Sequence, residues 1–85
     1  MMRNRDEILA LVAAQLATVL PLTGRVLQES DVLRELPEID SLNLVRVAAG
    51  LEKECGVQFD DATVFGAKTV GDLVDGISAA LTAKS

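Results

Sequence analysis

The residues best suited to chemistry are Asp40, Ser41 and Leu42, at the start of a helix that the sequence predicts from Ser41 to Cys55. A serine hydroxyl becomes a nucleophile beside a base such as histidine. The chain contains no histidine, and the lysine nearest in sequence, Lys53, lies at the far end of the same helix. The N–H groups at a helix start, with the helix dipole behind them, favour a phosphate on or near Ser41. We therefore interpret the hydroxyl as an attachment point, and a plain helix cap is the alternative.

The other residues that could support chemistry have simpler structural explanations. The single Cys55 excludes an intrachain disulfide and a Cys-x-x-Cys motif, and it is expected in the core because no nearby cation or base would activate it. Asp60 and Asp61 are expected to cap a helix, because two neighbouring carboxylates lack the number of ligands that calcium needs. No metal site is therefore expected. Phe59 and Phe65, the only aromatic residues, are expected in the core.

Helical spacing of apolar residues predicts the elements that precede Ser41. A first helix runs from about Asn4 to Leu20, and Pro21 ends it. The segment 21–39 that follows is long and contains helix breakers, with one short helical turn expected within 30–36. Apolar residues of that turn are expected to hold the loop against the core. A loop of this length in so small a domain is usually functional or spans the length of a bundle.

The elements from Ser41 onward complete the domain. Asp40 is a good N-cap for the helix that starts at Ser41, and Gly56 marks its end. A short helix is expected over 62–65, and a last one begins after Thr69 as N-cap. The tail after about Thr82 is expected to fray. The pattern predicts an all-α bundle of about four helices, with a core of Ile8, Val12, Leu16, Leu44, Val47, Leu51, Val70, Leu73, Val74 and Ile77.

Composition narrows the classes of function. The 85 residues make one domain, 1–85, with residues 1–3 and 83–85 expected to fray. Acidic residues outnumber basic ones by 13 to 8, which gives a formal net charge of −5. An acidic chain without a basic stripe is a poor candidate for binding nucleic acid or an anionic membrane, and it contains no apolar run near the roughly 18 residues that span a bilayer. We expect a monomer in the cytoplasm that binds proteins with basic docking faces.

The sequence around Ser41 resembles the acyl carrier protein family, within the superfamily of phosphopantetheine carriers that also includes peptidyl carrier proteins. The resemblance runs without a gap from Leu36 to Ile77 and continues more loosely toward the N-terminus. The positions that match in order and spacing are Leu36, Asp40-Ser41-Leu42, Leu44, Val45, Leu51-Glu52-Lys53-Glu54, Gly56-Val57, Asp60-Asp61 and Thr69-Val70-Gly71-Asp72-Leu73. It implies a four-helix carrier bundle with a long loop between helices I and II and a short helix III.

The resemblance also implies a covalent cofactor. In this family the serine of the motif, here Ser41, receives 4′-phosphopantetheine from coenzyme A through a phosphopantetheinyl transferase. The terminal thiol of this arm then holds an acyl group as a thioester, which other enzymes load and transfer, so the carrier itself is not an enzyme. Asp40 would cap the helix beside the phosphodiester. Leu42 would pack against partner enzymes, with a place in the core as the alternative.

Two positions on the predicted recognition helix depart from the family pattern. Typical members have acidic residues two and five positions after the serine, where this chain has Asn43 and Arg46. The charged residues Asp40, Arg46, Glu52, Lys53 and Glu54 sum to only −1. We therefore expect Leu42, Asn43, Arg46 and Glu52 to serve partners of a specialised pathway rather than housekeeping fatty-acid synthesis. The alternative for Arg46 is a solvated surface residue.

Three functions stay open at this stage. The favoured one is a discrete acyl carrier protein in fatty-acid or polyketide biosynthesis. The others are a free-standing peptidyl or aminoacyl carrier, and an unmodified helical adaptor. Pro37, Glu38 and Ile39 replace the usual glycines before the motif and are expected to stiffen the approach to Ser41. Gly50, inside the recognition helix, either lets helices pack closely or leaves room for a bound chain. Phe59 and Phe65 have the alternative of flanking a cleft for an acyl chain.

Overall fold

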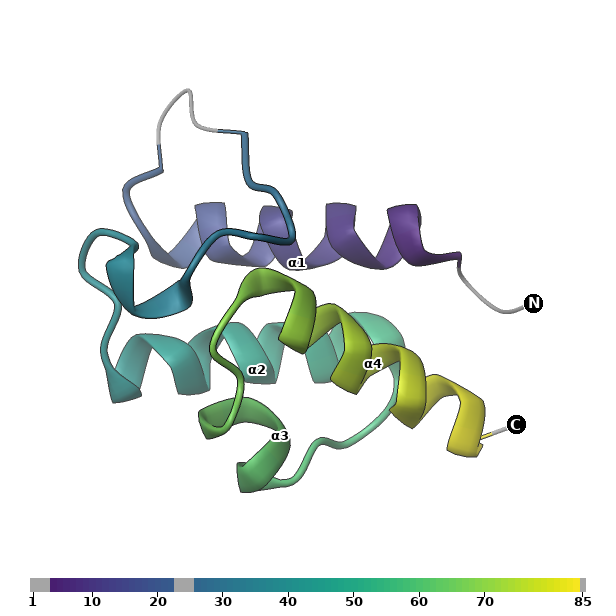
Figure 1. The fold of residues 1–85 in the computed structure, drawn as a ribbon. Helices are drawn as coiled ribbons and strands as arrows, with labels where there is room; N and C mark the ends of the chain where they lie inside the picture. Colours follow the sequence, from purple (N-terminus) through teal and green to yellow (C-terminus); the bar gives the residue numbers. More distant parts are fainter. Residues whose placement is uncertain (1–3, 23–25, 85) are drawn as a thin grey trace.

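The computed structural model describes residues 4–22 and 26–84, without the side chains of residues 83 and 84 (Figure 1). Its elements, in order, are α1 (Arg5–Val19), the 3-10 turn η1 (Leu33–Glu35), α2 (Ser41–Cys55), α3 (Asp61–Phe65) and α4 (Val70–Lys84). The described residues form no strand, only one isolated bridge between Val32 and Thr69. The all-α bundle, the long loop and the short third helix are confirmed.

Each α-helix is preceded by a residue whose side chain accepts a hydrogen bond from a backbone N–H of the first turn. The acceptors are Asn4, Asp40, Asp60 and Thr69, with donor–acceptor distances of 2.7 to 3.1 Å. These bonds satisfy N–H groups that the helix itself leaves unpaired. The last three caps are the predicted ones. α2 ends at Gly56, whose φ of 68° is a left-handed conformation that glycine adopts without strain.

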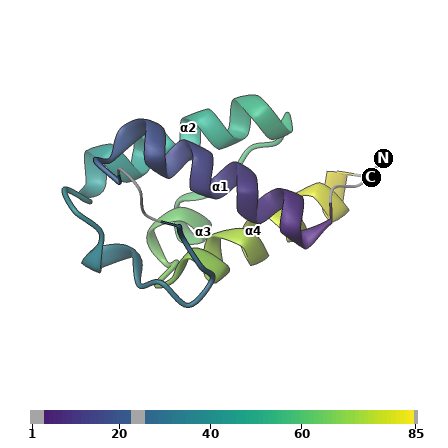
Figure 2. The same ribbon diagram turned by 90° about the horizontal axis from the view of Figure 1, so that it is seen from above.

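The long helices pack around an aliphatic core. α1 contacts both α2 and α4, and α3 bridges α2 and α4 at the other side (Figures 1 and 2). Of the ten predicted core residues, nine are buried. Leu44 is the exception: it is half-buried, because the groove described below keeps one side of it open. Cys55 is half-buried and packs against the core, as expected.

The long loop does not span the bundle. α1 runs antiparallel to α2, so α1 ends at the same end of the molecule at which α2 begins (Figures 1 and 2). The loop instead adds four buried leucines to the core, namely Leu22, Leu27, Leu33 and Leu36. Two of them belong to the predicted helical turn, so its role in holding the loop to the core is confirmed.

Backbone hydrogen bonds join the loop to the connection between α3 and α4. The N–H of Leu33 donates to the carbonyl of Lys68, and the N–H of Val70 donates to that of Asp31, both at 2.9 Å. Nearby, the exposed guanidinium of Arg5 bonds the Glu29 carboxylate at two of its nitrogens and Asp75 Oδ1 at 2.7 Å. The loop is therefore fixed to both α1 and α4 close to where α4 begins.

Three expectations need correction or completion. Phe65 is not in the core: its side chain is 49% exposed, because α3 is a single turn whose buried position is taken by Val64. α4 extends to Lys84, and residues 1–3 and 85 lie outside the described residues, so fraying at the two ends stays a prediction. A Cβ at Gly50 would lie 2.1 Å from Oε1 of Gln15 on α1, which favours close helix packing over space for a bound chain.

Candidate functional site

Ser41 is the first residue of α2, and its side chain is exposed. The capping bond comes from its neighbour: Oδ1 of Asp40 accepts the N–H of Asn43 at 2.7 Å. Within the described part of the chain, the Ser41 hydroxyl makes no hydrogen bond. The plain helix cap is therefore Asp40 and not Ser41, and the Ser41 hydroxyl is open to modification at the positive end of the helix dipole.

A groove of about 290 Å³ opens beside Ser41. Its volume is close to the lower limit of the roughly 300–1,000 Å³ that small-molecule sites occupy. Residues of the long loop, the start of α2, the end of α3 and the α3–α4 connection line it, namely Leu33, Arg34, Ile39, Asp40, Ser41, Leu44, Phe65, Ala67 and Lys68. A phosphopantetheine arm on Ser41 fits these surroundings, since the attachment atom lies at a groove with an apolar floor and two cations.

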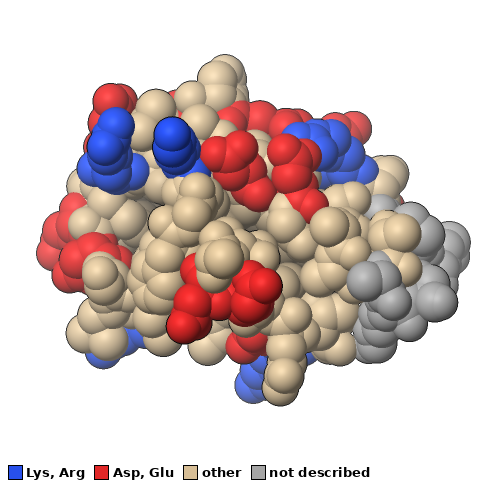
Figure 3. All heavy atoms as spheres, turned by 60° about the horizontal axis from the view of Figure 1, so that its bottom comes forward, with Lys and Arg blue, Asp and Glu red and all other residues tan. Residues whose placement is uncertain are grey.

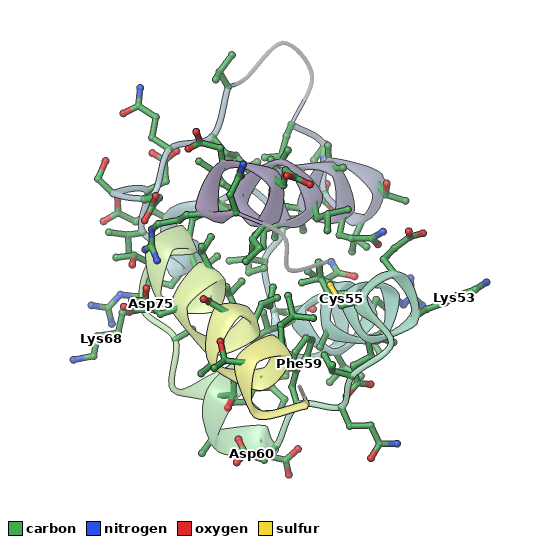
Figure 4. The ribbon with its side chains drawn as sticks, turned by 90° about the vertical axis from the view of Figure 1, so that its right-hand side faces the viewer. Lys53, Cys55, Phe59, Asp60, Lys68 and Asp75 are labelled. Atoms are coloured by element: carbon green, nitrogen blue, oxygen red, sulfur yellow. The ribbon has the colours of Figure 1, made fainter. Side chains whose placement is uncertain are left out.

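The cations at the groove, Arg34 and Lys68, are exposed. Lys68 points away from the helices in Figure 4, and Figure 3 shows basic side chains at the upper left of the face it views, with acidic side chains beside them. The Lys68 and Thr69 N–H groups both donate to the carboxylate of Asp72, which lowers the pKa of that group. The backbone of this connection is thus held in place while the lysine side chain stays in solvent.

Apolar side chains lie exposed near the start of α2. Leu42 is 59% exposed and Val45 48%, so the alternative that placed Leu42 in the core is wrong. Val45 and Phe65 also line a shallow depression of about 150 Å³ between α2 and α3. Exposed apolar residues that cluster in this way are typical of protein contact surfaces. Phe65 was missed as a surface residue because the sequence does not show which face of the short helix α3 is covered.

The polar residues expected to recognise partners have different surroundings. Arg46 is exposed, as a docking residue must be. The side-chain amide of Asn43 donates to the carbonyl of Glu38 at 2.8 Å, and Glu38 has a φ of 58°, which is unusual for a residue other than glycine. Oε2 of Glu52 accepts the N–H of Phe59 at 2.8 Å. Asn43 and Glu52 therefore have structural roles within the chain.

The interior between α2, α3 and α4 is nearly filled. Phe59 points inward there (Figure 4), and the cavity that it lines with Leu51 and Ile77 measures about 10 Å³. That is close to the roughly 10–15 Å³ needed for a single water. The cleft that Phe59 and Phe65 would flank is thus closed, and the groove beside Ser41, at about 290 Å³, is far larger.

Two classes of feature are absent from the described residues. The structure has no helix there that is both long and apolar enough to cross a bilayer. Within the same residues, no three side chains of the metal-binding types come together. Asp60, the helix cap, has a lowered pKa because the Thr63 hydroxyl and N–H both donate to it.

Comparison with known proteins identifies the family. Residues 10–77 match the family described as "Phosphopantetheine attachment site". The chain is 32% identical, over 72 residues, to a protein of Saccharopolyspora erythraea named "Acyl carrier protein"; the aligned region covers 85% of this chain and 76% of that protein. Proteins of this kind are carriers whose cofactor is phosphopantetheine, and they are not catalysts. The chain therefore belongs to the acyl carrier protein family of phosphopantetheine carriers.

Proposed function

We propose that Ser41 carries the 4′-phosphopantetheine arm and that the protein delivers an acyl group, held on it as a thioester, to enzymes of a specialised biosynthetic pathway. The observation that best supports this proposal is that Asp40 and Ser41 have different roles at the start of α2. Asp40 supplies the cap, at 2.7 Å from the Asn43 nitrogen, and Ser41 keeps an exposed hydroxyl. The matched region, residues 10–77, includes this serine. When attached, the arm supplies a thiol that activates an acyl group for transfer.

The experiment that tests the attachment is intact-mass measurement after incubation of the apo-protein with coenzyme A and a promiscuous phosphopantetheinyl transferase. The wild type should gain the mass of one phosphopantetheine group, and Ser41→Ala should gain none. Ser30→Ala is the matched control, because Ser30 is also exposed but lies in the long loop. Uptake by Ser41→Ala would refute Ser41 as the site, and no uptake by the wild type with several transferases would favour the unmodified adaptor.

We further propose that partners dock on the exposed face of α2 through Leu42, Val45 and Arg46. All three side chains are exposed. A basic docking face, which suits carriers with acidic residues at the position of Arg46, would meet a like charge here, and such juxtaposition costs several kcal/mol when desolvated. The native partner should therefore present an apolar patch beside an acidic or neutral group. This selects against housekeeping fatty-acid enzymes.

Charge reversal tests the role of Arg46. In the loaded carrier, Arg46→Glu should transfer its acyl group faster to a housekeeping ketosynthase than the wild type does, and the gain should shrink at high salt because ions screen the contact. Lys53→Glu makes the same change of charge at the other end of α2 and should have little effect. Asn43 is left unchanged, because its amide holds the Glu38 carbonyl. Equal rates for Arg46→Glu and the wild type would mean that Arg46 is a solvated surface residue.

The carried group decides between the acyl and aminoacyl alternatives. The holo-protein is incubated separately with malonyl transferases and with adenylating enzymes, and its intact mass is then measured. We expect loading by the malonyl transferases. Loading only by an adenylating enzyme would make the chain an aminoacyl carrier. That the protein is a monomer and lies in the cytoplasm stays a prediction.

A further inference from the structure

The groove beside Ser41 has a charge that contrasts with the rest of the molecule. The chain has a formal net charge of −5, yet two of the three charged residues that line the groove, Arg34 and Lys68, are cations, and the third is Asp40. Five basic side chains are described in the structure, at positions 5, 34, 46, 53 and 68. Among these, only Arg5 forms an ion pair within 4 Å. The charge of Lys68 also acts on the Asp72 carboxylate without forming such a pair. Arg34 and Lys68 can therefore still take an anion.

The backbone itself brings these two cations together. The N–H of Leu33 donates to the carbonyl of Lys68 at 2.9 Å, and Val32 forms a bridge with Thr69. Arg34 follows Leu33 directly, so the two basic residues stand on segments that are bonded to each other. Both residues line the same groove, so an anion there could meet a cation on either side.

The groove also contains the attachment atom of an anionic group. If Ser41 carries the arm, as proposed above, a phosphodiester is fixed at the edge of the same groove. Arg34 suits such a group because the planar guanidinium can donate two parallel hydrogen bonds to phosphate oxygens, and Lys68 suits it as a compact charge. The covalent bond to Ser41 keeps the phosphate at the groove that both cations line, so weak pairing suffices to hold it.

The floor of the groove suits the next part of the arm. Beyond the phosphate comes a pantoyl unit, in which one carbon bears two methyl groups and forms an apolar surface beside a hydroxyl. Leu33 and Ile39, from the loop, and Phe65, from α3, line the groove with apolar side chains, and Phe65 is 49% exposed before any such contact. The closed interior, with about 10 Å³, offers no comparable space.

We infer that the groove is the resting place of the arm, with the phosphodiester between Arg34 and Lys68 and the pantoyl methyl groups against Leu33, Ile39 and Phe65. The inference rests on the proposed function, because it requires the arm on Ser41. A partner that takes up the thioester must then lift the arm out of the groove. Because the two ion pairs are exposed, salt weakens them, and the arm leaves the groove more readily at high ionic strength.

The test uses the holo-protein, prepared with isotope-labelled protein and an unlabelled arm, in the wild type and in Arg34→Gln with Lys68→Gln. Nuclear Overhauser effects from the pantoyl methyl groups should reach the side chains of Leu33, Ile39 and Phe65 in the wild type. The double variant should weaken them about two- to thirtyfold, the range expected when two exposed ion pairs are lost. The control is Arg46→Gln with Lys53→Gln, which removes the same charge from exposed positions that do not line the groove.

The outcomes separate this inference from the proposed function. Failure of the wild type to take up the arm, seen by mass before any spectrum, would refute both. A holo-protein without methyl contacts to the groove would refute the inference alone. Contacts that persist in the double variant, or that fall equally in the control pair, would overturn the role of Arg34 and Lys68. Spectra of the apo-variants should overlay that of the wild type, because neither side chain makes a hydrogen bond within the described residues.

Discussion

Replacement of Asp40 by alanine should destabilise the apo-protein far more than replacement of its neighbour Ser41. The Asp40 carboxylate accepts the Asn43 N–H at 2.7 Å, while its own carbonyl accepts the Leu44 N–H at 2.9 Å and would do so equally in the variant. Only the side-chain cap is lost, and such losses cost about 0.5–2 kcal/mol, typically near 1. For a domain of this size, 1 kcal/mol corresponds to a fall of about 4–8 °C in Tm.

Ser41→Ala removes a side chain that is exposed and has no hydrogen-bond partner within the described residues. Surface changes of this kind stay within about 0.5 kcal/mol of the wild type. Asp40→Asn is the control, because asparagine caps helices as well as aspartate does, so this variant should stay close to the wild type. The assay is urea unfolding of the apo-proteins followed by circular dichroism, with an unchanged dependence of the unfolding free energy on urea concentration as the sign of an unchanged mechanism.

Equal losses for Asp40→Ala and Ser41→Ala would refute this reasoning. Ser41 would then contribute to the helix start, and its exposure would no longer separate a structural role from a role in attachment. A loss in Asp40→Asn as large as that in Asp40→Ala would mean that the charge of the residue, and not its hydrogen bond, stabilises α2.

Three further predictions follow from the same structure. Leu51→Ala, which empties a position 1% exposed, should cost about 2–5 kcal/mol in urea unfolding, and Leu42→Ala, at 59% exposed, should cost less than about 0.5. Backbone N–H groups that donate to the Asp72 carboxylate lower its pKa below the ordinary value of 3.8. The ionised carboxylate therefore stabilises the fold fully above pH 3.8, and this contribution is lost as the pH falls through the folded-state pKa. In Asp72→Asn, stability should depend less steeply on pH in the acid range. Glu38→Gly should raise the free energy of unfolding by up to about 1 kcal/mol in the same assay. A left-handed conformation costs a residue with a Cβ roughly 1–2 kcal/mol, and the greater freedom of glycine in the unfolded chain offsets about 0.5–1 kcal/mol of the gain. Glu38→Ala, which keeps the Cβ, should show no such gain.

The parts of the fold that sequence alone predicted are those with local signals. Apolar spacing located the helices, and capping residues fixed the starts of α2, α3 and α4 to within a residue or so. Burial in the middle of helices was also predictable, as with Val47 and Leu51. These signals act over one or two turns, so they can be read without knowing where the chain goes next.

The groove beside Ser41 was not predictable for the opposite reason. It is formed by loop residues such as Arg34 and by Lys68, which are 34 positions apart in the sequence. Their segments are joined by backbone hydrogen bonds such as that between Leu33 and Lys68. No periodicity marks such a pairing in the sequence. The same reason explains Leu44 and Phe65, which have apolar side chains but lie at the groove, where the core ends.

The departures from the family pattern beside the attachment motif compensate each other in the structure. Glu38 stands in the segment where family members usually have glycine, and its φ of 58° is a conformation that suits glycine better. The Asn43 amide, in place of the usual acidic residue, donates to the Glu38 carbonyl at 2.8 Å. An aspartate at position 43 could not donate this bond and would set a charge against the carbonyl oxygen. Asparagine at 43 therefore supports the strained segment that leads to Ser41. Arg46 is exposed and makes no such bond within the described residues, so it is the departure on which the proposed choice of partner rests.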